Sequence, residues 1–242
     1  MQILVIPDVH LKPWMFDRAA ELLRSEIAKQ AVCLMDIPDD WHRQFDLDLY
    51  ARTFDRATEF QREFPDTLWC WGNHDLSYLW DERESGYSFM APSTVRRGLR
   101  QLVEAIPREE QIRFIHRIDR VLFLHGGLTE QFVRRYCPEE EYDDVDAVIS
   151  RLNSLGHYEM WDDASPLWHR PQHRNEPMYK AGEFLQMVGH TPVDRIRRDG
   201  PVISCDVFST FRDRKPIGTE EFPLIDTETG AFRGLTRPES GN

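Results

Sequence analysis

The sequence predicts an α/β fold in which a parallel sheet is covered by helices. In residues 1–71, short apolar runs alternate with segments whose apolar residues recur at helical spacing. Strand, helix, strand, helix, strand in that order is typical of a parallel sheet with crossover helices. The chain has 242 residues, of which 40% are apolar, enough for one sizeable core. We therefore expect a single domain over residues 1–242.

The first five elements follow from the spacing of apolar residues. Four apolar residues before Pro7 predict a buried strand at residues 3–6, and similar runs predict strands at 31–35 and 67–71. Apolar residues three and four positions apart predict amphipathic helices between these strands. The two helices are expected at residues 16–27 and 50–64.

The second half of the chain is less regular. Residues 76–93 mix aromatic, charged and glycine residues and are expected to form an inserted loop. Its aromatic residues, among them Tyr78, Trp80 and Tyr87, are expected either to wall a binding site or to pack on a small cluster of their own. The tail from Pro238 is expected to be frayed. The remaining predicted elements are a helix at 95–106, a strand at 121–124, a helix at 145–152 and strands at 185–188 and 202–207.

Composition excludes several classes of protein. A charged fraction of 30% beside an aromatic fraction of 12% is not that of a disordered chain. No apolar run reaches the roughly 18 residues of a membrane span, and we see no secretory signal at the start. The four cysteines show no metal or redox spacing, and three of them lie in apolar stretches and are expected to be reduced core thiols, so we expect a cytoplasmic location. The net charge of −12 disfavours generic nucleic-acid binding, and the oligomeric state stays open.

Polar residues follow five of the predicted strands at the point where each strand ends. In open α/β sheets, ligands bind beyond the carboxyl ends of the strands. Oxygen and imidazole side chains suit Mn, Fe, Zn or Co rather than metals that prefer thiolates. The sequence therefore predicts a metal site at this edge. The five groups are Asp8 with His10, Asp36 with Asp39, Asn73 with His74, His125 before two glycines, and His190 after a glycine.

These motifs make the chain similar to the calcineurin-like metallophosphoesterase superfamily, from Asp8 to about Asp206. The His-Gly-Gly-Leu run at 125–128 and the Gly-His-Thr-Pro run at 189–192 resemble more specifically the bacterial phosphoprotein phosphatases of the PPP type. The resemblance implies an αββα sandwich of two mixed sheets flanked by helices. It also implies phosphate-ester hydrolysis at a two-metal site, with a phosphorylated substrate as partner.

The resemblance further implies a role for each strand-end residue. Two divalent ions are expected. Mn²⁺ is the preferred metal, and Fe, Zn, Co and Ni are the alternatives. His74 is expected not to bind metal but to protonate the leaving group, with Asp39 behind it to orient the ring. The implied ligands are Asp8 and His10 for the first ion, Asp36 for both ions, and Asn73, His125 and His190 for the second.

Departures from the family pattern bear on the substrate. The family usually has glycine before the bridging aspartate, where Met35 stands here, and Leu11 ends the first motif as in the nuclease branch. The arginine that usually follows the second aspartate and grips phosphate is replaced by Asp40. Diesterases and nucleases usually carry a second histidine where Pro192 stands.

Because Pro192 leaves the first metal with three protein ligands, as in the phosphoprotein phosphatases, a phosphomonoesterase or phosphoprotein phosphatase-like enzyme is favoured, whereas the missing arginine points toward a diesterase. Arg170, in a Trp-His-Arg run ahead of the last histidine motif, is the candidate that would replace the missing arginine at the phosphate. His169 and His173 lie near it in the sequence and could line the same wall. The alternatives are a phosphodiesterase or nuclease, a dinucleoside polyphosphate hydrolase, and a non-catalytic binding scaffold.

Overall fold

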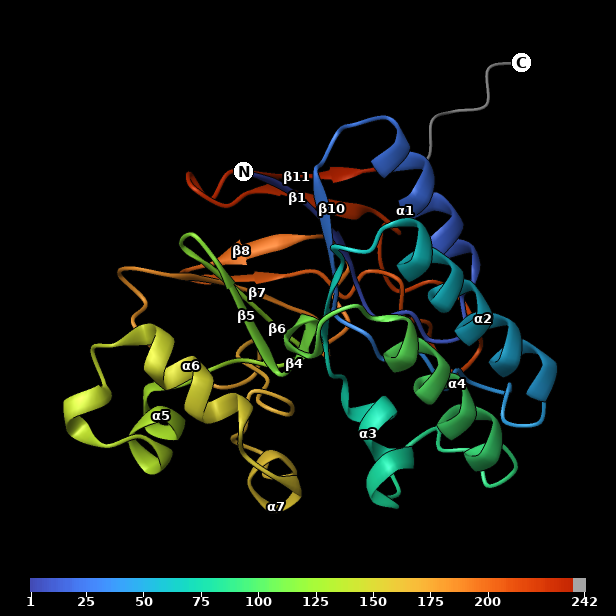
Figure 1. Cartoon of the computed structure of the whole chain (residues 1–242), viewed down its shortest axis with the longest axis horizontal. Coiled ribbons are helices and arrows are strands. Elements are labelled where there is room, and N and C mark those ends of the chain that lie inside the picture. Colours follow the sequence, from blue (N-terminus) through green and yellow to red (C-terminus); the bar gives the residue numbers. More distant parts are fainter. Residues whose placement is uncertain (237–242) are drawn as a thin grey trace.

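The computed structural model describes residues 1–236, and in this part of the chain two β-sheets lie between two layers of helices (Figure 1). This arrangement confirms the predicted αββα sandwich. The expectation about the tail from Pro238 concerns residues outside the described part. None of the helices in residues 1–236 combines the length and the apolar character that crossing a bilayer requires.

The first sheet has the strand order β11-β10-β1-β2-β3-β4. β1 to β4 run parallel, and β10 and β11 pair antiparallel beside β1. The carboxyl ends of the first three strands therefore meet at one edge. The strands are β1 (Gln2–Ile6), β2 (Gln30–Cys33), β3 (Leu68–Cys70), β4 (Ile112–Arg113), β10 (Phe222–Asp226) and β11 (Phe232–Leu235).

The second sheet has the order β5-β6-β7-β9-β8. Its three central strands, β6, β7 and β9, run parallel, and antiparallel β5 and β8 form its edges. Three more strands thus end side by side. The bounds are β5 (Ile115–Ile118), β6 (Val121–Leu124), β7 (Leu185–Val188), β8 (Arg197–Asp199) and β9 (Val202–Ser204).

Helices α1, α2 and α4 lie on one flank of the molecule and α5 to α7 on the other (Figure 1). Several begin at side-chain caps that accept a first-turn amide, as Asp46 does from Leu49 and Thr129 from Phe132. The helices are α1 (Trp14–Arg24), α2 (Leu47–Glu63), α3 (Asn73–Trp80), α4 (Pro92–Ala105), α5 (Glu130–Tyr136), α6 (Val145–Asn153) and α7 (His157–Met160), with 3₁₀ turns at Glu109–Gln111 and Glu139–Glu141.

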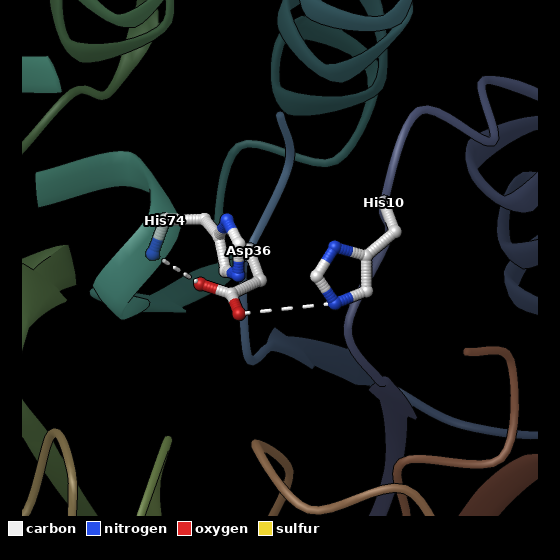
Figure 2. Close-up of side chains that lie close together, drawn as sticks. All are labelled: His10, Asp36 and His74. Atoms are coloured by element: carbon white, nitrogen blue, oxygen red, sulfur yellow. Dashed lines mark hydrogen bonds and ion pairs between the residues drawn. The ribbon is translucent and has the colours of Figure 1, made fainter. Parts of the chain in front are cut away.

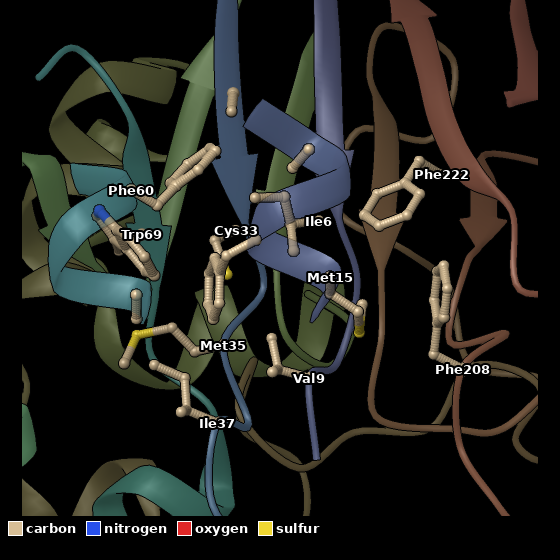
Figure 3. Packing of buried hydrophobic residues seen from close by; sticks show 14 of the residues in the cluster. Ile6, Val9, Met15, Cys33, Met35, Ile37, Phe60, Trp69, Phe208 and Phe222 are labelled. Carbon is tan, nitrogen blue, oxygen red and sulfur yellow. The ribbon is translucent and has the colours of Figure 1, made fainter. Parts of the chain in front are cut away.

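The core consists of three layers, one between the sheets and one under each set of helices. Alternate residues of β1 enter different layers: Leu4 and Ile6 pack under the helices, whereas Ile3 and Val5 pack between the sheets. Burial on both faces explains why the strand reads as a continuous apolar run. Figure 3 shows part of the layer under the helices, with Ile6 close to side chains from other elements.

The segment expected as an inserted loop is partly helical. Residues 76–80 complete α3, which ends at Asp81 in the left-handed conformation with φ 59°. The loop proper covers 81–91, because Pro92 begins α4 at a position where its missing N–H costs no hydrogen bond. Similarly, β9 ends at Ser204, before the apolar run ends at 207, since the backbone turns there.

Candidate metal centre

The carboxyl ends of strands from both sheets face a cavity of about 440 Å³. Residues that follow β1, β2, β3 and β7 line it, and the loop at 81–91 and the segment near residue 170 close its sides. Predicted site residues from distant parts of the sequence are therefore brought together. Those that line the cavity are His10, Asp36, Asp39, Asn73, His74, Arg170 and His190.

The backbone at these strand ends adopts conformations that L-residues rarely use. His10, Asp36 and His190 have φ of 42°, 43° and 61°. Met35, where the family usually has glycine, takes φ 56° with its side chain fully buried. Such positions cost of order 1–3 kcal/mol each and are concentrated at functional sites, where the surrounding structure holds them.

Two glycines let neighbouring strand ends approach each other closely. A Cβ at Gly72 would lie 2.2 Å from Asp36 Oδ1, and one at Gly189 would lie 1.9 Å from Asp8 Oδ1. The backbone amides that follow these glycines hold the carboxylates. His74 N donates to Asp36 Oδ1 at 2.9 Å, and His190 N donates to Asp8 Oδ2 at 2.8 Å.

Asp36 lies between two histidines that come from different sheets. Its Oδ2 is 3.9 Å from His10 Nε2 and 3.2 Å from His125 Nε2. Figure 2 shows the carboxylate of Asp36 directed toward His10 on one side and held by the backbone of His74 on the other. Burial favours the neutral carboxyl, but the nearby charges of His125 and His74 outweigh it and lower the pKa of Asp36.

The orientation of the histidines leaves their Nε2 atoms directed toward the centre. His10 Nδ1 donates to the carbonyl of Asp39 at 2.9 Å, and His125 Nδ1 donates to the carbonyl of Leu34 at 3.0 Å. Since a carbonyl only accepts, each Nδ1 carries a hydrogen, and Nε2 is available as a ligand. This is the usual support for a metal-binding imidazole.

The second group of ligand atoms comes from three elements. Asn73 Oδ1 lies 2.9 Å from His125 Nε2, so two potential ligand atoms are close together. The ring of His190 lies 5.0 Å from that of His125, between centroids, and His190 Nε2 has no hydrogen-bond partner among the described residues. Burial lowers the pKa of His190, which keeps the ring neutral and able to bind a cation.

The residues present fit divalent cations. Two groups of potential ligand atoms, His10 with Asp36 and His74, and Asp36 with His125 and His190, each lie within 4.8 Å of one another. Asp36 belongs to both groups. Asp8 Oδ1 is also buried without a partner within residues 1–236. Buried polar atoms left unpaired are costly, so a cation bound there would satisfy them.

His74 and Asp39 form a separate hydrogen-bonded pair at the cavity wall. His74 Nδ1 lies 3.0 Å from Asp39 Oδ2. The other oxygen, Asp39 Oδ1, accepts hydrogen bonds of 2.6 Å from both Tyr50 and Tyr78. Burial alone would lower the pKa of His74, but the negative charges of Glu84, Asp36 and Asp39 raise it well above its usual value. The ring is therefore held in one orientation, and the raised pKa favours its protonated form.

Arg170 enters the cavity from the segment before β7. Its Nη1 donates to the carbonyl of His190 at 2.6 Å and to Thr191 Oγ1 at 3.2 Å. Burial lowers its pKa, although the group stays a cation at any ordinary pH. His169 and His173 do not share this wall. His169 is fully buried with its ring 3.0 Å from where a Cβ of Gly127 would lie.

The loop at 81–91 reaches the cavity through residues that the sequence analysis did not single out. Glu84, Ser85 and Gly86 line the cavity, whereas none of the aromatic residues of this segment does. Trp80 stacks on His157 with centroids 4.8 Å apart, and Tyr87 stacks on Tyr78 at 4.4 Å. Of the two arrangements considered for these aromatics, the structure shows packing and not a wall.

Two further acidic groups were missed at the sequence level. Glu84 lies in an irregular segment that has no pattern to mark it, and it contacts Asn73 only because of how the loop folds. Asp206 follows β9, so the strand-end rule that found the other ligands could have found it.

Asp40, in place of the usual arginine, lies 3.6 Å from Lys12 Nζ and accepts from Thr210 Oγ1 at 2.7 Å.

The family model for calcineurin-like phosphoesterases matches residues 1–214, most of the chain. The chain belongs to the calcineurin-like phosphoesterase family. No curated protein matches it significantly. This membership agrees with the ligand-type residues at the strand ends and with the resemblance found in the sequence.

Solved structures of the same fold include a phosphatase. A cold-active protein-tyrosine phosphatase of a psychrophilic Shewanella species is 17% identical, with 97% of this chain and 80% of that chain covered and a TM-score of 0.59. A second structure of a cold-active protein tyrosine phosphatase gives 17% identity, 97% and 78% coverage and a TM-score of 0.53. An archaeal phosphodiesterase is 14% identical, with 97% and 99% coverage and a TM-score of 0.43. At 17% identity, the similarity to the two phosphatase structures, with TM-scores above 0.5, concerns the fold alone.

Proposed function

We propose that this chain is a dinuclear metal-dependent phosphoesterase that hydrolyses phosphate monoesters. The observation that carries the proposal is the position of Asp36, whose Oδ2 lies between the Nε2 atoms of His10 and His125 in a cavity that also contains Arg170. A carboxylate oxygen shared by two imidazoles from opposite sheets suits a ligand common to two ions. Family membership supports phosphoester hydrolysis as the reaction class.

The proposed ligands are those of the two groups described above. Two divalent ions would lower the pKa of a water molecule and neutralise phosphate oxygens. We propose Mn²⁺, with Fe, Zn, Co and Ni as alternatives, because the donors are oxygens and imidazoles. The first ion would be held by Asp8, His10 and Asp36, and the second by Asp36, Asn73, His125 and His190.

Arg170 is the proposed phosphate-binding residue. Its Nη1 is held by the chain at 190–191, and neither Nε nor Nη2 has a hydrogen-bond partner among the described residues. A guanidinium fork binds two terminal oxygens of a monoester at once. Asp40, which replaces the family's arginine, is paired with Lys12 and Thr210 and offers no cation to phosphate.

His74 is the proposed proton donor to the leaving oxygen. It lines the cavity with a raised pKa, and Asp39 holds its Nδ1, so that Nε2 is the atom able to donate. Tyr50 and Tyr78 hold Asp39 in turn. Asn73 contributes a neutral oxygen to the centre, which leaves more positive charge for substrate than a carboxylate would.

Phosphodiester hydrolysis is the alternative that a specific observation favours, namely the acidic Asp40 where the family has arginine. A diester carries less negative charge and needs a phosphate-binding cation less. Dinucleoside polyphosphate hydrolysis and a non-catalytic scaffold remain further alternatives. The four buried free cysteines agree with the expected cytoplasmic location, which stays a prediction.

A substrate screen tests the proposal. The metal-free chain is supplied with Mn²⁺ and assayed on phenyl phosphate, bis-nitrophenyl phosphate, a phosphopeptide and a dinucleoside polyphosphate. We expect Mn²⁺-dependent hydrolysis of the monoester, and loss of both metal content and activity in Asp36→Asn. Faster hydrolysis of the diester would favour the alternative. No hydrolysis of any substrate by a chain that holds two ions would indicate a scaffold.

A further inference from the structure

Asp206 lies at a sixth strand end of the same edge. β7 and β9 pair in parallel with Val188 beside Ser204, so the residues that follow each strand emerge together. The carbonyl of Asp206 accepts a hydrogen bond of 2.9 Å from Val193 N, just after the last histidine motif. The fold therefore places Asp206 beside the segment that carries His190.

Both strands are followed by a three-residue turn closed by a backbone hydrogen bond. Thr191 N donates to the carbonyl of Gly189 at 2.6 Å, and Val207 N donates to the carbonyl of Cys205 at 2.8 Å. Each is a three-residue turn, with His190 at the centre of the first and Asp206 at the centre of the second. Both central residues line the cavity. The turns differ in hand, since His190 has φ 61° and Asp206 does not have a positive φ, but each places its central residue at the cavity.

The carboxylate of Asp206 is buried without a partner. The residue is 1% exposed, and neither carboxylate oxygen accepts a hydrogen bond of good geometry from the described residues. Burial raises the pKa of Asp206, although the nearby Ser209 hydroxyl acts to lower it. Within residues 1–236, no lysine, arginine or histidine lies within ion-pair distance of it. A buried carboxylate is normally paired or bound to a metal, because the unpaired charge is expensive to desolvate. A cation on the cavity side would supply such a partner.

The residues that share the cavity wall with Asp206 indicate which ion it would reach. Asp206 lines the cavity together with His10 and Asp36, and its charge acts on buried Asp8 and on His10. Asp8 and His10 are two of the three proposed ligands of the first ion. The second group of ligands, around His125 and His190, has its full set of donors without Asp206.

We propose that Asp206 is a fourth protein ligand of the first divalent ion, beside Asp8, His10 and Asp36; this inference rests on the dinuclear centre of the proposed function. Pro192, two residues after His190 in the last motif, has no ligand atom in its side chain. The carboxylate of Asp206, which follows the neighbouring strand β9, would take the place of a ligand from that position. The first site then has three carboxylates and one imidazole. Such a donor set favours Mn²⁺ or Fe²⁺ over softer ions.

Metal binding measured apart from catalysis tests the assignment. The metal-free wild-type chain, Asp206→Asn and Asp206→Ala are titrated with Mn²⁺, with free Mn²⁺ followed by electron paramagnetic resonance and bound metal by elemental analysis. We expect two ions in the wild type. In Asp206→Ala one ion should bind at least about tenfold more weakly while the other is unchanged. Asp206→Asn should be intermediate, because it keeps a neutral oxygen and the shape of the side chain.

Asp75→Asn is the matched control. Asp75 is also fully buried, has an unpartnered Oδ2 and lies near Asp36, but its Oδ1 accepts from Ile37 N and it does not line the cavity. We expect this variant to bind both ions as the wild type does. Thermal unfolding without metal shows whether each variant folds, and Mn²⁺ should raise the melting temperature of Asp206→Asn less than that of the wild type.

Two results would overturn the assignment and leave the proposed function intact. One is binding of both ions with wild-type affinity by Asp206→Ala and Asp206→Asn. The other is an equal loss of affinity in Asp75→Asn, which would mean that only the buried charge matters. A wild-type chain that binds fewer than two ions would contradict the dinuclear centre and the Asp206 assignment together.

Discussion

The side-chain amide nitrogen of Asn73 lies 2.7 Å from both carboxylate oxygens of Glu84. Because this nitrogen only donates, the contact fixes the amide with its oxygen directed at His125, 2.9 Å away. A residue of the loop at 81–91 thus orients a proposed ligand that begins α3. The same contact places a carboxylate inside the cavity that a phosphate would enter.

Glu84→Gln should improve the binding of a negatively charged substrate. The glutamine oxygen can still accept from Asn73, while the negative charge is removed. We expect the Michaelis constant for phenyl phosphate and the inhibition constant for inorganic phosphate to fall about two- to tenfold, the scale of roughly 1 kcal/mol for a partly exposed charge. Glu82→Gln is the control, since Glu82 in the same loop pairs with His157 outside the cavity, 2.9 Å away. Unchanged constants in Glu84→Gln would mean that the carboxylate does not face the phosphate.

His74→Asn should keep both metal ions and lose turnover in a way that depends on the leaving group. A positioned proton donor is worth about 10²- to 10⁴-fold, so turnover of phenyl phosphate should fall by that factor. The turnover of nitrophenyl phosphate should fall much less, because nitrophenolate leaves without needing a proton. Elemental analysis checks the metal content. Equal losses on both substrates, or loss of one ion, would instead indicate that His74 is a ligand, as its place in the group with His10 and Asp36 allows.

Arg170→Ala should raise the Michaelis constant and lower the turnover of monoesters, by a combined ~2–4 kcal/mol in kcat/KM. Arg170→Lys should recover only part of this loss, because an ammonium cannot bind two oxygens as a fork does. Hydrolysis of a diester should fall less. Steady-state kinetics on both substrates check the prediction, and unchanged monoester kinetics in Arg170→Ala would remove the residue from the substrate site.

His116 should make the fold sensitive to acid independently of the metal centre. Burial lowers the pKa of His116 to about 4, against about 6.5 for an exposed histidine, while its Nε2 bonds the carbonyl of Trp69 at 3.0 Å. Below pH 6.5 the unfolded chain binds a proton that the folded chain does not. The free energy of unfolding should therefore fall between pH 6.5 and 4, by up to about 3 kcal/mol.

Urea unfolding at pH 7 and pH 4.5, with a chelator present, measures this effect. His116→Gln should lose less stability than the wild type between the two pH values, since glutamine does not titrate. His173→Gln, at an exposed position, should behave as the wild type. The same loss in His116→Gln and wild type would place the acid sensitivity elsewhere.

Local sequence patterns were sufficient for the predicted strands and helices of the first sheet, since their periods are strong and their ends are marked. They did not predict β4, β5, β8, β10 or β11, most of which are short or form sheet edges. Such strands depend on pairing with distant partners, as β10 does with β1 across more than 200 residues. The loop after α3 was also poorly defined, because its irregular residues have no period.

The sequence by itself determined which side chains could bind metal, because polar residues directly after buried strands must emerge at the carboxyl edge of a parallel sheet. It placed Asp8, Asp36 and His190 at that edge without any coordinates. Only the tertiary structure decided which of these atoms meet. The two sheets pack so that Asp36 lies between His10 and His125, and β9 brings Asp206 beside His190. The spacing of apolar residues along the chain indicates which face of a strand or helix a residue occupies. Contacts between strands that are distant in sequence depend on how the layers pack.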